Sequence, residues 1–301
     1  MSRLDLRFDA TARGRSTPLR YIFAACSLLV VGIADRAAAA DWPLRGSITP
    51  TYTRWDGFYA GGQAGQSFSS ADFSNATSSM ASFILANTEL QPILSNWTTL
   101  PNSSTGGISY GAFIGYNFQW EDVVMGGELN YDHMGLKNAA QNTIGPILVP
   151  GANLPDGSTV LYTVTMDSSV GLKITDVLTA RGRAGWAIDR YLPYAFFGLA
   201  VARVDVFRTV DISGLKSTTP PPPLGGPVPP PVVGALNLPR NPQLQSTAGQ
   251  IVYGYTAGLG IDIALLPNVF FRAEWEFIQF PNINDFRVAM NSVRGGLGVK
   301  F

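Results

Sequence analysis

The stretch Tyr255–Ile263, YTAGLGIDI, decides the fold of this chain. Its apolar residues occupy every second position, and Thr, Gly or Asp lies between them. A period of two is typical of a β-strand with one apolar face, whereas a helix repeats every 3.6 residues. The same alternation recurs over 55–68, 108–120, 122–136, 178–188, 192–208, 271–277 and 293–301. The pattern therefore predicts eight antiparallel strands.

The connections between these stretches alternate in length. Short turns are predicted near 121, 189–191 and 266–268, and long connections over 69–106, 138–172 and 209–249, with a short last one near 281–286. Outer-membrane barrels combine short periplasmic turns with long extracellular loops, and their apolar faces point outward into lipid. Because unpaired backbone groups are costly in hydrocarbon, such a sheet closes on itself. We therefore expect an all-β fold, a closed antiparallel transmembrane β-barrel of eight strands, whose count would change if segments such as Thr159–Met166 extend the sheet.

Aromatic residues gather at the ends of the predicted strands, as in the interfacial girdles of membrane barrels: Trp55, Phe58, Trp120, Trp186, Tyr191, Tyr194 and Phe280. The sequence ends with Leu297, Val299 and Phe301 at alternate positions. A terminal aromatic residue after alternating apolar residues resembles the signal that the barrel-assembly machinery recognises. We therefore predict that these three residues form an assembly signal and that this machinery is a partner.

The first forty residues have the organisation of a secretory signal peptide. A basic segment that ends at Arg20 precedes the apolar run 21–34, and three alanines follow at 38–40. This run is shorter than the roughly 20 residues that a spanning helix needs. We predict a signal peptide over 1–40 that is cleaved after Ala40, a periplasmic tail over 41–54 and the barrel over 55–301.

The composition excludes several classes of function. Only 14% of the residues are charged, against about a quarter in ordinary soluble domains. The whole chain has 21 basic and 21 acidic residues, of which six basic and three acidic residues lie in 1–40, so 15 basic and 18 acidic residues remain. This slightly negative net charge predicts no basic surface for binding nucleic acid. The one cysteine, Cys26, would leave with the leader, so no disulfide, thiolate metal site or cofactor is expected.

Many charges fall on the polar faces of the predicted strands, which would face the lumen. They are Glu128, Arg181, Arg183, Arg203, Asp205, Asp262, Arg272, Glu274, Glu276, Arg294 and Lys300. These side chains would either line a selective channel or form a buried ion-pair network. Eight strands enclose an interior just wide enough for side chains, and buried charges are normally paired, so the network is the preferred interpretation.

Three further features have competing interpretations. His133 is the only histidine, and lipid A-modifying barrel enzymes use His with Ser; no serine adjoins it in the strand pattern, which favours a titratable rim residue. Met80, Phe83, Ile84, Leu90, Leu94 and Trp97 have helical spacing that would suit a plug or a helix on the outer leaflet, but Pro92 favours ordinary loop packing. The proline-rich segment 219–231 predicts a stiff polyproline II spacer, with a partner-binding motif as the alternative.

Five motifs in order carry a family resemblance: WDGFYAGG (55–62), GGELNY (126–131), TARGRAGW (179–186), YAFFGLA (194–200) and RGGLGVKF (294–301). They resemble the small outer-membrane β-barrel proteins of alphaproteobacteria, a surface-antigen or porin-like family related to the OmpA-type eight-stranded barrel. The resemblance implies a polar interior largely filled by side chains, variable surface loops and no defined substrate. The proline-rich segment departs from the family pattern.

The sequence therefore predicts a non-enzymatic integral protein of the bacterial outer membrane with a structural and surface-antigen role. The alternative is a narrow porin for small hydrophilic solutes, lined by the charges named above. A second alternative is a lipid-modifying enzyme centred on His133. The expected partners are outer-membrane lipid, including lipopolysaccharide, and the barrel-assembly machinery.

Overall fold

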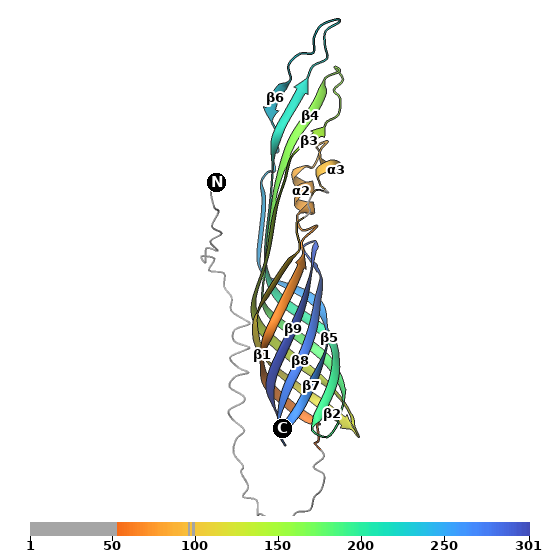
Figure 1. Cartoon of the computed structure of the whole chain (residues 1–301), viewed down its shortest axis with the longest axis vertical. Coiled ribbons are helices and arrows are strands. Elements are labelled where there is room, and N and C mark those ends of the chain that lie inside the picture. Colours follow the sequence, from red (N-terminus) through yellow and green to blue (C-terminus); the bar gives the residue numbers. More distant parts are fainter. Residues whose placement is uncertain (1–52, 96, 98–99) are drawn as a thin grey trace, which may run out of the picture. The chain divides into compact units, whose positions relative to one another are not determined.

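The computed structural model describes residues 53–95, 97 and 100–301, so the predicted signal peptide and most of the predicted tail lie outside the described residues. The strands are β1 (Gly57–Asp72), β2 (Ser103–Trp120), β3 (Val123–Pro150), β4 (Thr159–Trp186), β5 (Tyr191–Thr219), β6 (Val232–Ala235), β7 (Gln243–Leu266), β8 (Val269–Ile283) and β9 (Phe286–Lys300) (Figure 1). Two short helices, α2 (Ser78–Ile84) and α3 (Gln91–Leu94), lie between β1 and β2. Neither has the length and apolar content of a membrane-crossing helix.

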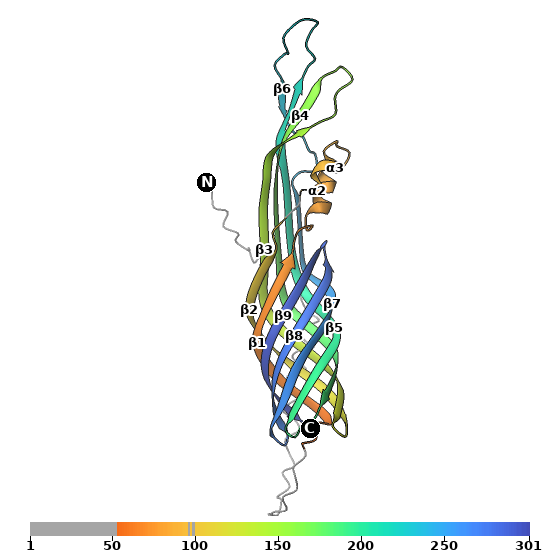
Figure 2. The ribbon, with the colours of Figure 1, turned by 45° about the vertical axis from the view of Figure 1, so that its right-hand side comes forward.

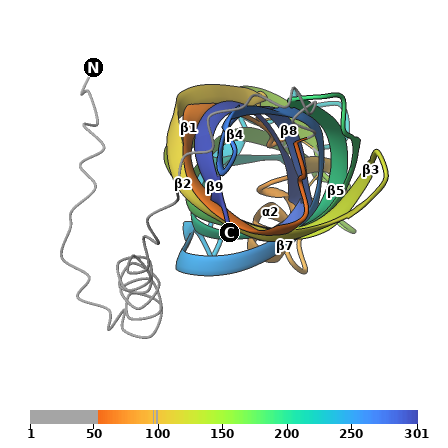
Figure 3. The same ribbon diagram turned by 90° about the horizontal axis from the view of Figure 1, so that it is seen from below.

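Eight of these strands form a closed antiparallel ring. Each pairs with its neighbours in the order β4-β3-β2-β1-β9-β8-β7-β5, and pairing of β4 with β5 closes the circle. The ring is visible when the barrel is seen along its axis (Figure 3). The prediction of a closed eight-stranded barrel is confirmed, and β6 is a short addition that pairs with the end of β5.

The short connections use residues that tolerate a left-handed backbone. Glu121 and Asp189 have φ values of 53° and 52° in two turns at one end of the ring. At the other end, Asn284 and Asp285 alone connect β8 to β9, with φ values of 46° and 74°. Two consecutive residues with positive φ are what a type I′ hairpin turn requires, and Asn and Asp adopt this conformation more readily than most residues.

Within the ring, the alternation places apolar residues outside and polar residues inside. Ile114, Leu199 and Leu297 expose 56%, 67% and 57% of their surface, which is the arrangement of a lipid-facing barrel and the inverse of a soluble sandwich. Inward-facing glycines leave space for large rings. A Cβ atom on Gly260 would lie 2.4 Å from the ring of Tyr194, so glycine here allows an aromatic side chain to cross the interior.

The sheet continues beyond the ring, contrary to the prediction of long loops over 138–172 and 209–249. β2 pairs with β3 only as far as Met134, whereas β3 stays paired with β4 up to Pro150, and β4 with β5 up to Thr219. The segment Thr159–Met166 is part of β4. In this extension most inward-facing residues are apolar, such as Val164 and Val210, with the polar Asn138 and Arg208 buried among them, and the apolar residues need a cover.

The first long connection supplies that cover (Figure 2). The buried Met80, Ile84 and Leu94 of α2 and α3 pack on inner residues of the extended strands. Pro92 lies in the first turn of α3, where proline costs no hydrogen bond, so it separates two helices. The segment thus forms two short helices, as its spacing indicated, and they pack against the extended sheet.

Candidate functional site

The interior of the ring is the candidate functional site, because nine of the eleven charges predicted to face the lumen are buried in it. They are Glu128, Arg181, Arg183, Asp262, Arg272, Glu274, Glu276, Arg294 and Lys300. They come from five strands, β3, β4, β7, β8 and β9. The alternation of each strand directs them to a common interior.

Arg181 joins carboxylates from opposite sides of the ring. Its Nη2 atom lies 2.5 Å from Glu128 Oε1 and 2.7 Å from Glu274 Oε2, and its Nη1 atom donates to Glu274 Oε1 at 2.8 Å. Glu128 is its direct cross-strand partner, whereas Glu274 reaches it from β8 across the lumen. Charge-assisted bonds of this two-pronged kind are the strong class of hydrogen bond.

Arg183 and Arg272 form a second group around Asp262. Arg183 Nη2 lies 2.7 Å from Asp262 Oδ2, and Arg272 Nε lies 2.9 Å from Asp262 Oδ1. Arg272 Nη1 also donates to Glu128 Oε2 at 2.8 Å. Glu128 therefore connects the two groups, and the side chains form one network.

Arg294 completes the network on the β9 side. Its Nη2 atom lies 2.5 Å from Glu274 Oε1 and 2.6 Å from Glu276 Oε2, and its Nη1 atom bonds Asp132. Asp132 was not among the predicted lumen residues. Its position two and four residues after Asn130 and Glu128 on one strand is the signal that could have identified it.

Two buried tyrosines were also missed by the sequence analysis. Tyr59 donates its hydroxyl hydrogen to Glu128 Oε2 at 2.7 Å, and Tyr194 donates to Glu274 Oε2 at 2.9 Å. The guanidinium carbon of Arg183 lies 3.7 Å from the centre of the Tyr194 ring, a cation–π contact. A tyrosine has an apolar body and a polar end, so its place in an alternating pattern does not show which face it occupies.

The aromatic-girdle prediction is therefore wrong for three of its seven residues. Phe58, Trp120, Trp186 and Tyr191 are exposed on the outside, whereas Trp55, Tyr194 and Phe280 are buried. Trp55 packs in an apolar cluster between the ionic network and the Glu121 and Asp189 turns, and Phe280 packs in a cluster on the opposite side of the network. Aromatic residues close to a turn occur on both faces of the strands: some fill the lumen and others meet the membrane interface. Distance from the turn along the sequence therefore does not show which face an aromatic residue occupies.

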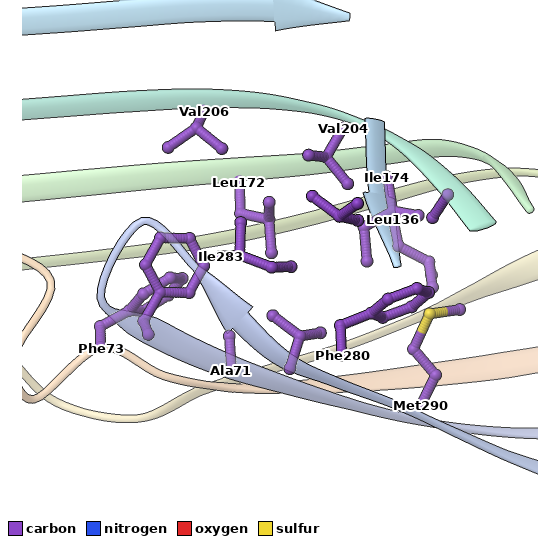
Figure 4. Close-up of a cluster of buried hydrophobic side chains, with 14 of the residues drawn as sticks. Ala71, Phe73, Leu136, Leu172, Ile174, Val204, Val206, Phe280, Ile283 and Met290 are labelled. Atoms are coloured by element: carbon purple, nitrogen blue, oxygen red, sulfur yellow. The ribbon is translucent and has the colours of Figure 1, made fainter. Parts of the chain in front are cut away.

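Apolar layers lie on both sides of the network. At the end of the ring that carries the Glu121 and Asp189 turns, Trp55 packs with Phe113, Leu192 and Phe270. On the other side, Ser67 contacts Ser109 and Ser292, each at 2.8 Å. Beyond the serines lies a cluster of buried apolar residues that includes Ala71, Leu136, Ile174, Val204, Phe280 and Met290 (Figure 4). Ionic, hydroxyl and apolar layers therefore occupy the interior of the described barrel in succession.

Arg203 and Asp205 do not face the lumen, and this part of the prediction is corrected. The buried residues of β5 carry even numbers, from Leu192 to Ile212, and the two charges lie between them on the outer face. Asp205 Oδ1 accepts a hydrogen bond from the Gly249 amide at 2.7 Å. The sequence analysis placed β5 in the wrong phase because Ala and Val occupy both of its faces there.

His133 lies on the outside of β3, close to Asp176. Its Nδ1 atom lies 2.9 Å from Asp176 Oδ1, and the Tyr131 hydroxyl donates to the same oxygen at 2.7 Å. The three side chains form a polar group on the outer face of adjacent strands. Among the residues that the structure describes, no group of three His, Cys, Asp or Glu side chains is arranged to hold a metal ion.

Comparison with known protein families identifies the family of this chain. The outer membrane protein beta-barrel domain matches residues 23–301. The chain belongs to this family. Its place is accordingly the bacterial outer membrane, where the ring spans the lipid with its exposed apolar band.

Solved structures with a similar fold include several outer-membrane proteins. Neisserial surface protein A is 14% identical, with 81% of this chain and 97% of that chain covered and a TM-score of 0.31. Ail, the attachment invasion locus protein of Yersinia pestis, is 10% identical over 81% and 99%, with a TM-score of 0.30. The N-terminal β-barrel domain of Pseudomonas aeruginosa OprF is 13% identical over 80% and 99%, with a TM-score of 0.27. A search of curated proteins finds no match.

Proposed function

We propose that this member of the outer membrane protein beta-barrel domain family is a closed structural barrel that displays a long extracellular sheet. The observation that carries the proposal is the interior, where four arginines and five carboxylates bond one another between two apolar layers. The sequence motifs further support placement among the alphaproteobacterial surface antigens. The role is then to reinforce the envelope and to present the surface extension.

The filled interior argues against the runner-up, a narrow porin. A pore needs charges that face water, but the side chains of Arg181, Glu128 and Glu274 expose 1% or less of their surface. Their hydrogen-bonding groups are directed at one another. To pass through the ring, a solute would have to displace this network and also the apolar cluster next to it. A permanently open channel is therefore energetically unfavourable.

Planar-bilayer conductance of the purified mature protein tests the proposal. We expect no discrete current steps under conditions in which a general porin, reconstituted in parallel, conducts. Heat-dependent gel mobility of the same preparation establishes that the barrel is folded. Reproducible steps from folded protein would contradict the proposal and would favour the porin.

A lipid-modifying activity centred on His133 is the least supported alternative, since within the described part of the chain its imidazole bonds Asp176 and no serine hydroxyl. His133→Ala separates the two interpretations. A structural barrel predicts that cells with this variant have the same lipid A profile by mass spectrometry as cells with the parent protein. A changed acylation pattern at equal protein levels would establish the enzyme.

A further inference from the structure

The outer face of the extended sheet becomes apolar at its tip. In the middle of the extension, the outward positions of β4 and β5 hold polar residues, such as Ser169, Thr209 and Ser213. At the tip, four large apolar side chains occupy outward positions: Leu148 on β3, Leu161 on β4, Leu215 on β5 and Val233 on β6. They expose 63%, 40%, 48% and 56% of their surface, respectively. We call these four residues the tip apolar face.

Strand register places the members of this face side by side. One row runs from Leu148 on β3 through Thr163 on β4 to Leu215 on β5. The next row, two residues farther along each strand, contains the other two members. Residues directly opposite each other in a ladder project from the same side of the sheet. The tip apolar face is therefore one surface that spans four neighbouring strands.

Membrane lipid does not cover this surface. Leu161 lies roughly 55 Å along β4 from Leu178 of the lipid-facing band, at about 3.3 Å per residue. The extension indeed continues far beyond the ring (Figure 1). Groups of apolar side chains exposed together on a protein surface mark docking sites. We therefore expect a partner that binds beyond the membrane.

A pair of carboxylates borders the tip apolar face. Asp167 and Asp211 lie directly opposite each other on the same outer surface, and Asp211 is about 13 Å along β5 from Leu215. The Thr143 hydroxyl donates to Asp167 Oδ1 at 2.5 Å, and the Asn241 amide donates to Asp211 Oδ1 at 2.7 Å. Within the described part of the chain, neither carboxylate has a basic side chain at ion-pair distance. Like charges directly opposite each other destabilise a strand pair, so a cationic group bound beside them would reduce that cost.

This carboxylate pair argues against a second copy of the chain as the partner. Barrels in one membrane share one orientation, so a two-fold axis along the membrane normal would bring the same surface of each copy together at the same height. The pair formed by Asp167 and Asp211 would then face the identical pair of the other copy. Like charges placed together across an interface oppose binding. A partner of opposite charge avoids this repulsion.

We propose that the tip apolar face binds a cationic amphipathic helix of an extracellular partner. The apolar side of such a helix would pack on the four exposed side chains, as helices pack on the apolar face of a sheet. Lysine or arginine residues next to that side would lie beside Asp167 and Asp211. This inference rests on the extracellular position of the extension in the proposed function and is independent of whether the lumen conducts.

The test is isothermal titration calorimetry of the purified mature protein in phosphatidylcholine nanodiscs with a designed helical peptide that has leucines on one side and lysines on the other. Empty nanodiscs give the heat of peptide binding to lipid, which is subtracted. Leu161→Ser and Leu215→Ser are each expected to weaken binding about tenfold, because both leucines become buried in the complex. The matched control is Leu224→Ser, which removes a fully exposed leucine of the proline-rich segment and should keep parental affinity. If either variant fails to fold, Val233→Ser replaces it, with the same expected loss.

The charged part of the proposal has its own variants. Asp167→Asn combined with Asp211→Asn should weaken binding about fivefold at low salt and remove most of its salt dependence, because salt screens exposed charges. Asp156→Asn removes one exposed carboxylate of the connection between β3 and β4 and should change neither quantity. A peptide with glutamates in place of the lysines should bind the parent protein more weakly than the lysine peptide does.

Parental affinity in both leucine variants would overturn the proposal, as would an equal loss in Leu224→Ser or equal binding of the glutamate peptide. A dimer of the parent protein in native mass spectrometry that Leu215→Ser dissociates would also overturn it, because a second copy would then be the partner. Heat-dependent gel mobility establishes that each variant is folded. Since the lumen is tested separately by conductance, failure of this inference leaves the closed barrel unaffected.

Discussion

Single residues of the lumen differ in how many partners depend on them. Arg181 bonds Glu128 and Glu274, and all three side chains are almost completely buried. Desolvation makes such a network costly to form, but removing one member is costlier, because the remaining charges stay buried without their partner. The network is therefore a point at which small changes should have large effects on stability.

We predict that Arg181→Ala lowers the free energy of unfolding by about 3–5 kcal/mol, since it removes one of the guanidinium groups that bind each of two buried carboxylates, Glu128 and Glu274. Guanidinium chloride unfolding in detergent micelles measures the change. The matched control is Arg190→Ala, whose side chain is 63% exposed beside Asp189 and which should alter stability by less than about 0.5 kcal/mol. Equal stability of the two variants would show that the ion pairs contribute no net stability.

A second prediction at this scale concerns the contact between the first connection and β4. The Tyr162 hydroxyl donates to Glu89 and, with the Ala152 amide, holds the pKa of that carboxyl below its usual value of 4.5. Burial and the adjacent Glu89 raise the pKa of Tyr162 to about 12, so the phenol remains a donor at ordinary pH. The carboxylate form is thus the one that the folded state stabilises.

A lowered pKa in the folded state contributes stability that is complete above the unfolded value and is lost as pH falls through the folded value. Amide hydrogen exchange near Glu89 should therefore quicken as pH falls below about 4.5, after correction for the intrinsic rate. Tyr162→Phe removes the donor and should abolish most of this dependence. An identical pH profile in the variant would show that other groups control it.

At the scale of elements, α2 and α3 are short, and packing against the sheet rather than helix propensity stabilises them. Leu94 is completely buried in the contact, whereas its neighbour Ile93 is 41% exposed. We expect Leu94→Ala to cost about 2–5 kcal/mol in the stability of this connection and to increase its proteolysis. Ile93→Ala should change the cleavage rate little, and equal rates would contradict the packing described for α3.

The last strand carries the predicted assembly signal. Leu297, Val299 and Phe301 point outward, and Phe301 exposes 74% of its surface, so it adds little packing within the barrel. We predict that Phe301→Ala lowers the amount of folded barrel in outer-membrane fractions severalfold, whereas refolded protein unfolds as the parent does. Trp120→Ala removes an equally exposed aromatic residue at the same end and serves as the control. Equal losses in both variants would indicate a general interfacial effect in place of a signal.

The same strands shield their apolar side chains from water in two different ways along their length. In the ring, lipid covers the apolar outer face and polar side chains fill the interior. Beyond the ring the same strands are surrounded by water, and the apolar face turns inward, where α2 and α3 cover it. Register shifts in the pairs between β3, β4, β5 and β7 mark the boundary between the two regimes.

The sequence by itself determined the class of fold, because alternation and turn chemistry act locally. The eight ring strands, their short turns and nine of the eleven lumen charges follow from the period of two read along each strand. Where a strand is apolar on both faces, as around Arg203, its phase is ambiguous, and the prediction was wrong there.

Only the tertiary structure decided how the strands continue and which partners meet. Thr159–Met166 is strand because β5 pairs with it and the first connection covers its inner face, and neither partner is encoded within the segment itself. The bonds from Arg181 to Glu274 and from Tyr59 to Glu128 join residues far apart in the sequence. Barrel closure sets these distances, so local patterns show that the charges face inward, but the closed ring determines which of them pair.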